Sequence, residues 1–414
     1  LPGCASMGLD TFGFGVDKAH SERAETLANR GDYAGAAYIY ENLARSNRGK
    51  SRTGYLQKAL AYYQQAGDQA SAARIRMALD NEAVSLPNAK AGEIAVMLPF
   101  SGAYANASNA IRQGMDTLNT RQPEDKRPQL RYLDSSGGNL ATAIKQAQSA
   151  TLVLGPLSKE SVEKITAAAD YNSPTIALNQ VSDYSRRGIY QFGLSPIAEG
   201  EMIADKAWRD GHRTATVIYP QSSWGNRYEE GFRKRWHSLG GSLSSRVIYP
   251  QEAQGFTNTV SSAIEKPADA IFIVAKPTNA RQIRAQLLFA GSTETAVYAA
   301  STAYDRRLYG AKDSDFENVW IPVLPWTVPG AVHTALPSYQ ELEAGESFNP
   351  GLAKFYAFGI DAMLLALNAE NLNSGMVLKG ATGDLSVDSN GIVRRNMLWL
   401  HYKDGTPTRH VPSS

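Results

Sequence analysis

Residues 93–119, with the sequence EIAVMLPFSGAYANASNAIRQGMDTLN, decide the fold class of this chain. Ile94 to Leu98 form a nearly unbroken apolar run, which is typical of a strand buried on both faces of a parallel sheet. Ser101-Gly102 predict a turn, and the apolar residues after them recur at helical spacing. This unit predicts the first half of a βαβ crossover. Ligands bind beyond the carboxyl ends of strands in open α/β sheets, so residues 101–104 are a candidate site loop, although a plain turn is the simpler interpretation.

The composition is that of an ordinary globular chain with more than one domain. Of its 414 residues, 43% are hydrophobic and 20% are charged. This length predicts two or three domains, because domains usually contain on the order of 100–200 residues. The 42 Lys and Arg residues nearly balance the 40 Asp and Glu residues, so nucleic acid is a poor candidate partner. We find no run of about 18 apolar residues and therefore expect no membrane-spanning helix.

The chain contains a single cysteine, Cys4, which excludes an internal disulfide and a cysteine-based zinc cluster. Cys4 follows Leu1-Pro2-Gly3, and this context resembles the lipobox of bacterial lipoproteins, whose cysteine is lipidated after the signal peptide is removed. The resemblance implies a lipid anchor in a membrane, and Ala5 at the next position implies the outer membrane. An incidental cysteine near a disordered end is the alternative.

Residues 17–80 predict a small helical domain, which follows an N-terminus and Gly-rich tether at residues 1–16. Apolar residues at helical spacing are interrupted at Gly31-Asp32 and again at Gly67-Asp68, close to the roughly 34-residue period of tetratricopeptide repeats. Such domains usually need about three repeats to be stable, and this region has only two helix pairs. We therefore expect it to be stabilised by contacts with the next domain. Binding of a protein partner and a role as a spacer both stay open.

Beyond a linker at residues 81–92, predicted strands and helices alternate, which indicates a doubly wound α/β architecture. The alternation restarts after residues 190–192, so we expect two lobes. A long apolar helix at residues 352–372 and a β-ribbon then follow; the ribbon turns at residues 388–391 and includes residues 397–402.

This order of elements resembles the type I periplasmic binding proteins, in which the chain crosses between the lobes three times. The resemblance implies crossings near Ser195, residues 325–326 and Lys379. It assigns the two lobes as follows: residues 93–195 with 326–379 form the first lobe, and residues 196–325 with 380–412 form the second.

Three further stretches resemble one family more closely. They are VLGPLSKESVEKI at residues 153–165, IYQFGLSP at residues 189–196 and KGATGDLSVDSNGIVRR at residues 379–395. These stretches are similar to the LpoA family, with a likeness over about residues 93–405. The resemblance implies an outer-membrane lipoprotein that activates a class A penicillin-binding protein in peptidoglycan synthesis without being an enzyme. The short helical region departs from the family, whose better-known members carry a much longer one.

The motifs of common catalytic sites are missing from the sequence. The six histidines form no His-Glu-x-x-His pattern, and there is no Gly-x-Ser-x-Gly elbow, phosphate-binding loop or Rossmann fingerprint. Glu229 and Glu230 are adjacent on a predicted helix and point apart, unlike the paired carboxylates of glycosidases. Asp134 ends a predicted strand near the predicted cleft and is the one acid that we consider as a candidate. We therefore expect no catalytic residue, no metal and no cofactor.

A cleft between the lobes is the candidate binding site, with hydroxyl, amide and aromatic side chains that suit a small ligand. By position, its predicted lining is Ser101, Tyr104, Ser135, Ser136, Pro156, Ser158, Asn179, Gln180, Tyr219, Ser222, Trp224, Lys276, Thr302, Tyr304 and Trp326. Amino-acid receptors of this fold clamp the ligand ammonium with an acid at the first crossing, where this chain has Ser195-Pro196. An α-amino acid is thus disfavoured, and a solute-binding lipoprotein of an ABC transporter is the alternative function.

A predicted helix at residues 227–237 carries four cations that could steer an acidic partner: Arg227, Arg233, Lys234 and Arg235. A solvated helix face, with the aromatic residues of the same helix in the core, is the simpler interpretation.

Overall fold

The computed structural model describes residues 11–47, 49–80, 85–183, 185–310 and 312–410. The predicted lipidation site, Cys4, and part of the predicted linker lie outside these residues. The chain divides into two compact units. The first combines the N-terminal helices with the loops Ser182–Arg187 and Asp388–Gly391, and the second contains the two sheet-based lobes.

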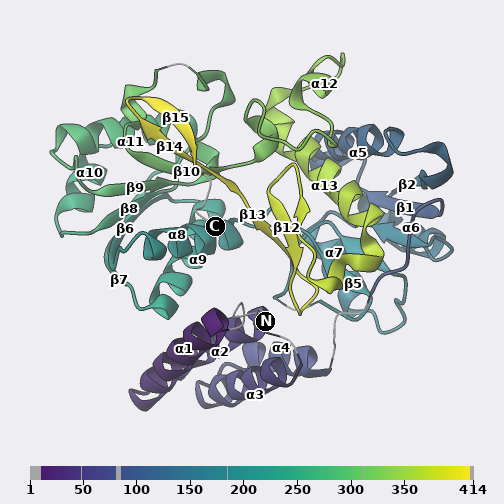
Figure 1. The fold of residues 1–414 in the computed structure, drawn as a ribbon, viewed down its shortest axis with the longest axis horizontal. Coiled ribbons are helices and arrows are strands. Elements are labelled where there is room, and N and C mark those ends of the chain that lie inside the picture. The colour runs from purple at the N-terminus through teal and green to yellow at the C-terminus, as the bar shows by residue number, and fades with distance from the viewer. Residues whose placement is uncertain (1–10, 48, 81–84, 184, 311, 411–414) are drawn as a thin grey trace, which may run out of the picture. The chain divides into compact units, whose positions relative to one another are not determined.

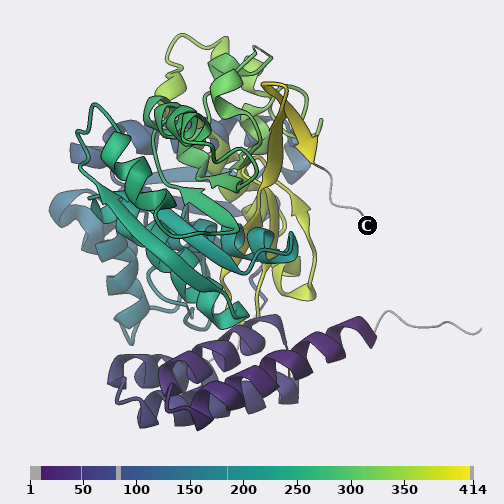
Figure 2. The same ribbon diagram turned by 90° about the vertical axis from the view of Figure 1, so that its left-hand side faces the viewer.

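The described part of the first unit contains four helices that pack in sequence order and lie side by side (Figures 1 and 2). They are α1 (Thr11–Asn29), α2 (Tyr33–Ser46), α3 (Gly49–Gln65) and α4 (Gln69–Asp80). Helix α1 begins inside the segment expected to be a tether. Small side chains such as Ala36 and Ala59 are fully buried where the helices meet.

The two Gly-Asp pairs explain the breaks between these helices. Gly31 and Gly67 adopt positive φ angles of 84° and 73°, which glycine tolerates at the end of a helix. The carboxylate of Asp32 then accepts a 2.8 Å hydrogen bond from the Gly35 amide, and Asp68 accepts one of 3.0 Å from the Ser71 amide. Each pair therefore ends one helix and caps the next.

The first lobe of the second unit is built on a parallel five-stranded sheet with the order β2-β1-β3-β4-β5. Strand β1, which lies between β2 and β3, is buried from Ile94 to Leu98, as the apolar run predicts. Helix α6 covers one face of the sheet, and helices α5 and α13 pack together. The strands are β1 (Glu93–Leu98), β2 (Gln129–Asp134), β3 (Leu152–Leu154), β4 (Thr175–Ala177) and β5 (Ile189–Gln191). The helices are α5 (Ala105–Thr120), α6 (Leu140–Ala147), α7 (Lys159–Ala167) and α13 (Ala353–Leu367).

The second lobe is built on a seven-stranded sheet with the order β15-β14-β10-β9-β8-β6-β7. Helices α8 and α9 cover one face and α10 and α11 the other, so the predicted doubly wound architecture is confirmed (Figure 1). The strands are β6 (Thr214–Pro220), β7 (Ser242–Tyr249), β8 (Ala270–Ile273), β9 (Ala296–Ala299), β10 (Val319–Val323), β14 (Leu398–Lys403) and β15 (Thr406–His410). The helices are α8 (Pro196–Arg209), α9 (Ser223–Leu239), α10 (Thr257–Ile264) and α11 (Pro277–Phe289), and the short helix α12 (Tyr339–Glu343) precedes α13.

The β-ribbon is shorter than predicted. Strands β11 (Leu378–Lys379), β12 (Asp384–Val387) and β13 (Val393–Asn396) form a separate three-stranded sheet, which turns at residues 388–391 as expected. Residues 397–402 do not continue it, because β14 joins the seven-stranded sheet between β10 and β15. The ribbon also meets the first lobe, where Ile392 forms a parallel bridge with Gln191.

One pair of glycines in each lobe lets two helices approach at backbone distance. A Cβ atom on Gly359 would overlap the Ile111 carbonyl, and one on Gly114 would overlap the Tyr356 carbonyl, so α5 and α13 cross here. Gly200 and Gly231 make the equivalent crossing between α8 and α9. Only glycine permits such contact, since any larger residue would push the helices apart.

The segment Pro350–Leu367 is long and apolar enough to span a membrane by length and composition, although the sequence predicted no such segment. Most of this segment is buried in the protein, at 61%. It contains α13, which packs on α5, so its apolar character is explained by its place in the core of the first lobe.

Candidate functional site

A cavity of about 430 Å³ lies between the two lobes of the second unit. Its walls come from the starts of α5, α7, α8 and α13, from the loop after β4, and from α9. The lining residues are Tyr104, Ala107, Leu157, Lys159, Leu178, Asn179, Gln180, Gly193, Leu194, Ser195, Pro196, Arg227, Lys354, Phe355 and Phe358.

The topology places this cavity at the carboxyl ends of the parallel strands. Residues after β3, β4 and β5 reach it directly, and the helices that follow β3 and β5 begin there. Loops at this edge of an open α/β sheet surround a crevice, because successive connections leave the sheet on opposite faces. The cavity therefore lies where the fold itself creates a concave surface.

Several polar side chains around the cavity already serve the local structure. Ser195 caps α8 by accepting a 3.3 Å hydrogen bond from the Ala198 amide, and Pro196 occupies the first turn. The amide of Asn179 donates a 2.9 Å hydrogen bond to the Leu157 carbonyl. These contacts fix the loops of the site without providing reactive groups.

The charged side chains that line the cavity are all cationic. Lys159 belongs to α7, Arg227 to α9 and Lys354 to α13, and none of the lining residues is Asp or Glu. Burial lowers the pKa of Lys354, and the attraction of Glu199 opposes that shift. The site therefore presents positive charge from both lobes.

Two buried carboxylates, Glu199 and Asp361, accept hydrogen bonds from neighbouring segments. Glu199 on α8 accepts hydrogen bonds from the Ser301 amide at 2.7 Å and the Ser301 hydroxyl at 2.8 Å, and from the Tyr228 hydroxyl at 3.0 Å. Asp361 on α13 accepts from the amides of Ala381 and Thr382 at 2.6 and 2.7 Å. Burial raises the pKa of Glu199, and it raises that of Asp361 to about 6.

Three of the predicted cleft residues, Tyr104, Asn179 and Gln180, line this cavity. The cavity is also lined by Lys354, Phe355 and Phe358, which were not predicted from the sequence. The signal that could have found them is the start of the long apolar helix: if α13 belongs to the first lobe, its first turns lie at the same edge as those of α5.

Other residues that were predicted to line the cleft form hydrogen bonds or helix caps in nearby loops. The Ser101 hydroxyl donates a 2.8 Å hydrogen bond to Ser136, and the Ser136 hydroxyl donates one of 2.6 Å to Asp134. Ser158 and Ser222 cap helices α7 and α9. The Ser135 amide donates a 3.0 Å bond to the Leu98 carbonyl.

The larger predicted side chains pack within the lobes. Tyr219 is 2% exposed and Trp326 is 1% exposed, and the Trp326 indole donates a 2.8 Å hydrogen bond to the Pro337 carbonyl. The Tyr304 hydroxyl donates to the Thr327 carbonyl at 3.3 Å, and the Trp224 ring packs edge-on against Tyr228. The assignment of these residues to a ligand site stays a prediction.

The cationic helix face expected at residues 227–237 is largely neutralised. Arg233 pairs with Glu229 at 3.0 Å, Lys234 with Glu230 at 2.7 Å, and Arg235 with Asp205 at 2.7 Å. Arg227 differs from these three because it lines the cavity instead.

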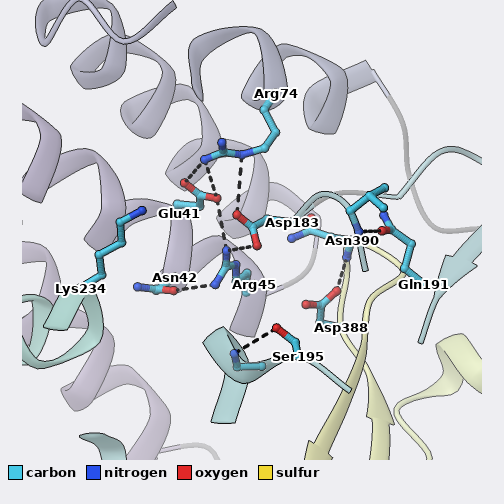
Figure 3. A network of polar contacts seen from close by, with 12 residues as sticks. Glu41, Asn42, Arg45, Arg74, Asp183, Gln191, Ser195, Lys234, Asp388 and Asn390 are labelled. Carbon is cyan, nitrogen blue, oxygen red and sulfur yellow. Dashed lines mark hydrogen bonds and ion pairs between the residues drawn. The ribbon is translucent and has the colours of Figure 1, made fainter. Parts of the chain in front are cut away.

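A second polar cluster lies in the first unit, where α2 and α4 contact the loop Ser182–Arg187 (Figure 3). The buried carboxylate of Glu41 lies 3.4 Å from the Arg45 guanidinium and 3.3 Å from that of Arg74. Both arginines also approach Asp183, at 3.0 and 3.8 Å. The cluster ties a loop that follows β4 to helices at the beginning of the chain.

Two α/β lobes with a cleft between them and crossings at the hinge define a type I periplasmic-binding-protein-like fold. A protein from Rhodospirillum rubrum, described as "a putative branched-chain amino acid ABC transporter", superposes with a TM-score of 0.63 over 79% of this chain and 100% of its own, at 17% identity. That likeness concerns the fold alone. Full-length LpoA from Haemophilus influenzae superposes with a TM-score of 0.68, over 98% of this chain and 84% of its own, at 22% identity.

Residues 40–405 match the family described as "LppC putative lipoprotein", and the chain belongs to this family. The penicillin-binding protein activator LpoA of Haemophilus influenzae is 31% identical over 324 residues, which are 76% of this chain and 54% of that protein. The protein of the same name from Pasteurella multocida is 27% identical over 321 residues, with 76% and 54% covered. The expected relationship to LpoA is confirmed, and the chain spans about half the length of these relatives.

The C-domain of Haemophilus influenzae LpoA, described as "a regulator of PBP1A", is 27% identical and superposes with a TM-score of 0.65. The match covers 77% of this chain and 100% of that domain. These names describe regulators rather than enzymes.

Proposed function

We propose that this protein is an outer-membrane lipoprotein, anchored through Cys4, that binds and activates a class A penicillin-binding protein in peptidoglycan synthesis. The observation that carries this proposal is the 31% identity to a penicillin-binding protein activator over 324 residues. Because those relatives are about twice as long as the matched region, activation by this chain is our inference.

A non-enzymatic role agrees with the hydrogen bonding of the acids near the cleft. Asp134 accepts hydrogen bonds from the Ser136 amide at 3.0 Å and hydroxyl at 2.6 Å, and from the Phe100 amide at 3.1 Å. These contacts lower the pKa of Asp134, so it is a poor proton donor at neutral pH. Glu199 is enclosed by its own hydrogen-bond donors. The acids therefore stabilise loops in our proposal.

The test uses the full chain with Cys4→Ser, which removes the proposed lipidation site, and a purified class A synthase from the same bacterium. We expect the two proteins to bind and the rate of peptidoglycan cross-linking to rise with the concentration of the chain. The matched control is a solute-binding protein of the same fold at equal concentration, which should leave the rate unchanged. Absence of both binding and rate change would refute the proposal.

A solute receptor of an ABC transporter is the second candidate, and the preformed cavity of about 430 Å³ favours it. The cavity offers no acid to hold the ammonium group of an amino acid. A thermal-shift screen detects a solute, because a ligand that binds only the folded state raises the melting temperature with concentration, and the synthase assay then shows whether the chain is also an activator. A receptor should respond to a solute and leave the synthase unaffected, whereas an activator should raise the rate of the synthase.

A further inference from the structure

The cavity between the lobes concentrates positive charge without a carboxylate in its lining. Lys159 and Lys354 approach from the first lobe and Arg227 approaches from the second. Cations that share a cleft repel one another, and the low-dielectric walls of a cleft strengthen that repulsion. Such an arrangement is stabilised when an anion enters.

The protein neutralises comparable cations elsewhere on the same helix but leaves Arg227 unneutralised. Arg233 lies about 1.7 turns further along α9 and pairs with Glu229 at 3.0 Å, whereas Arg227 makes no ion pair with any described residue. Lys354 likewise makes no ion pair within 4.0 Å of any carboxylate in the described part of the chain. Glu199 attracts the Lys354 ammonium from further away, and that ammonium lies 5.0 Å from the Phe355 ring centroid. Lys159 lies 4.0 Å from Glu163, an exposed pair that contributes little.

The remaining walls of the cavity indicate that a bound anion would also have an apolar part. Phe355, Phe358 and Leu194 supply apolar surface, and Phe358 is held by stacking on Phe192 with ring centroids 4.4 Å apart. A volume of about 430 Å³ lies in the usual range for small-molecule sites. The cavity therefore suits a small organic molecule with an apolar part and an anionic head.

We propose that the cavity binds a small organic anion that carries a carboxylate or phosphate group, with Arg227 and Lys354 as its direct charge partners. Arginine holds carboxylate and phosphate oxygens through two parallel hydrogen bonds, and lysine acts as a point charge. Because the two cations belong to different lobes, one bound anion contacts both lobes at once. This binding is a property separate from activation of a synthase.

The experiment measures ligand binding to the full Cys4→Ser chain by titration calorimetry and by thermal shift. The probes are benzoate and phenyl phosphate, which carry the two anionic heads on an apolar ring, and benzyl alcohol as the neutral analogue. We expect one or both anions to bind and to raise the melting temperature, and the neutral analogue to bind at least tenfold more weakly, a difference of about 1.4 kcal/mol. The stronger of the two anions identifies the preferred head group.

Variants then locate the bound anion. We expect Arg227→Gln and Lys354→Gln each to weaken binding by about tenfold, because each removes one charge-assisted contact. Lys354→Arg keeps the charge and should restore much of the affinity. Arg233→Gln is the matched control, since it removes the same net charge from the same helix but outside the cavity. The melting temperatures of the unliganded variants show that each is folded.

Three results would overturn the proposal. The first is no detectable binding of either anion at concentrations up to about 10 mM, far above the affinity of a functional site. The second is equal binding of the neutral analogue. The third is equal loss of affinity in Arg233→Gln, which would indicate a general effect of net charge on an adventitious site.

Discussion

Arg52 of helix α3 donates a 2.6 Å hydrogen bond to the side-chain oxygen of Asn390, which lies 338 positions later in the chain. Both residues are nearly inaccessible to solvent, at 5% and 4% exposed. Asn390 belongs to the turn between β12 and β13, and its neighbour Ser389 donates a 3.0 Å hydrogen bond to the Ala44 carbonyl. The turn of the ribbon is thus part of the compact unit formed by the N-terminal helices.

We predict that Asn390→Ala destabilises the helical unit by about 1–3 kcal/mol, because a buried guanidinium loses its side-chain acceptor. Limited proteolysis of the helices, followed as a function of urea concentration, measures this change. Asn390→Asp is the control, since it keeps an acceptor oxygen at the same place and should protect the helices better than alanine. Equal protection of the wild-type chain and Asn390→Ala would contradict the prediction.

We predict a larger effect for Glu41→Ala. The Glu41 carboxylate is fully buried, accepts a 2.6 Å hydrogen bond from the Tyr63 hydroxyl, and faces Arg45 and Arg74. Removal of one partner from a buried ionic cluster costs about 3 kcal/mol. Urea unfolding of the helices, monitored by circular dichroism, should show this loss. Asp183→Ala provides the comparison.

Asp183 contacts the same two arginines, but its side chain is 38% exposed. Water replaces much of an exposed ion pair, so Asp183→Ala should cost less than about 1 kcal/mol. If the two variants lose equal stability, the burial of Glu41 does not determine its contribution.

The glycine pair between α5 and α13 yields a prediction with an internal control of opposite sign. Gly359→Ala should destabilise the second unit by at least about 1–3 kcal/mol, because its Cβ would overlap the backbone of Ile111 and force the helices apart. Gly54 lies within helix α3, and a Cβ there meets no atom within 4 Å. Gly54→Ala should therefore stabilise its helix by up to about 1 kcal/mol. Thermal unfolding measures both changes, and a neutral Gly359→Ala would show that the helices can separate freely.

The sequence predicted those parts of the fold whose signals are local. The apolar run Ile94 to Leu98 indicated a buried parallel strand, and the Gly-Asp pairs indicated the helix breaks, because burial and capping act on adjacent residues. Strand β10 was missed because Pro322 interrupts its apolar run, and proline argues against a strand inside a sheet. Its place there depends on pairing with β14, about 80 positions away, which no local pattern encodes.

The candidate site was harder to predict for a similar reason. Asn179 and Gln180, which were predicted from their position at a strand end, line the cavity, since the topology places all such loops at one edge. The charge of the site depends on Arg227 and Lys354, which come from helices more than 120 residues apart. Whether a cation on α9 meets a carboxylate or faces the cavity depends on tertiary packing, which separates Arg227 from Arg233. The sequence showed four cations on one helix, but it did not show which of them lines the cavity.

The last prediction concerns His401, whose ring lies parallel to Trp320 with centroids 4.0 Å apart and whose Nε2 atom lies 2.9 Å from the Asn318 side-chain oxygen. Burial is the main cause that lowers its pKa to about 4, and the nearby Lys403 and Lys206 lower it further. The folded protein therefore binds this proton less readily than the unfolded chain does, so the contribution of His401 to stability is complete above the ordinary histidine pKa of about 6.5 and is lost as pH falls towards 4. We expect the free energy of unfolding to fall by about 1–2 kcal/mol over this range from this group. Urea unfolding at pH 7 and at pH 4.5 measures the fall, and His401→Gln, which cannot titrate, should show a smaller one. His333→Gln replaces an exposed histidine and serves as the control; if it changes the pH dependence as much as His401→Gln does, the buried ring is not the cause.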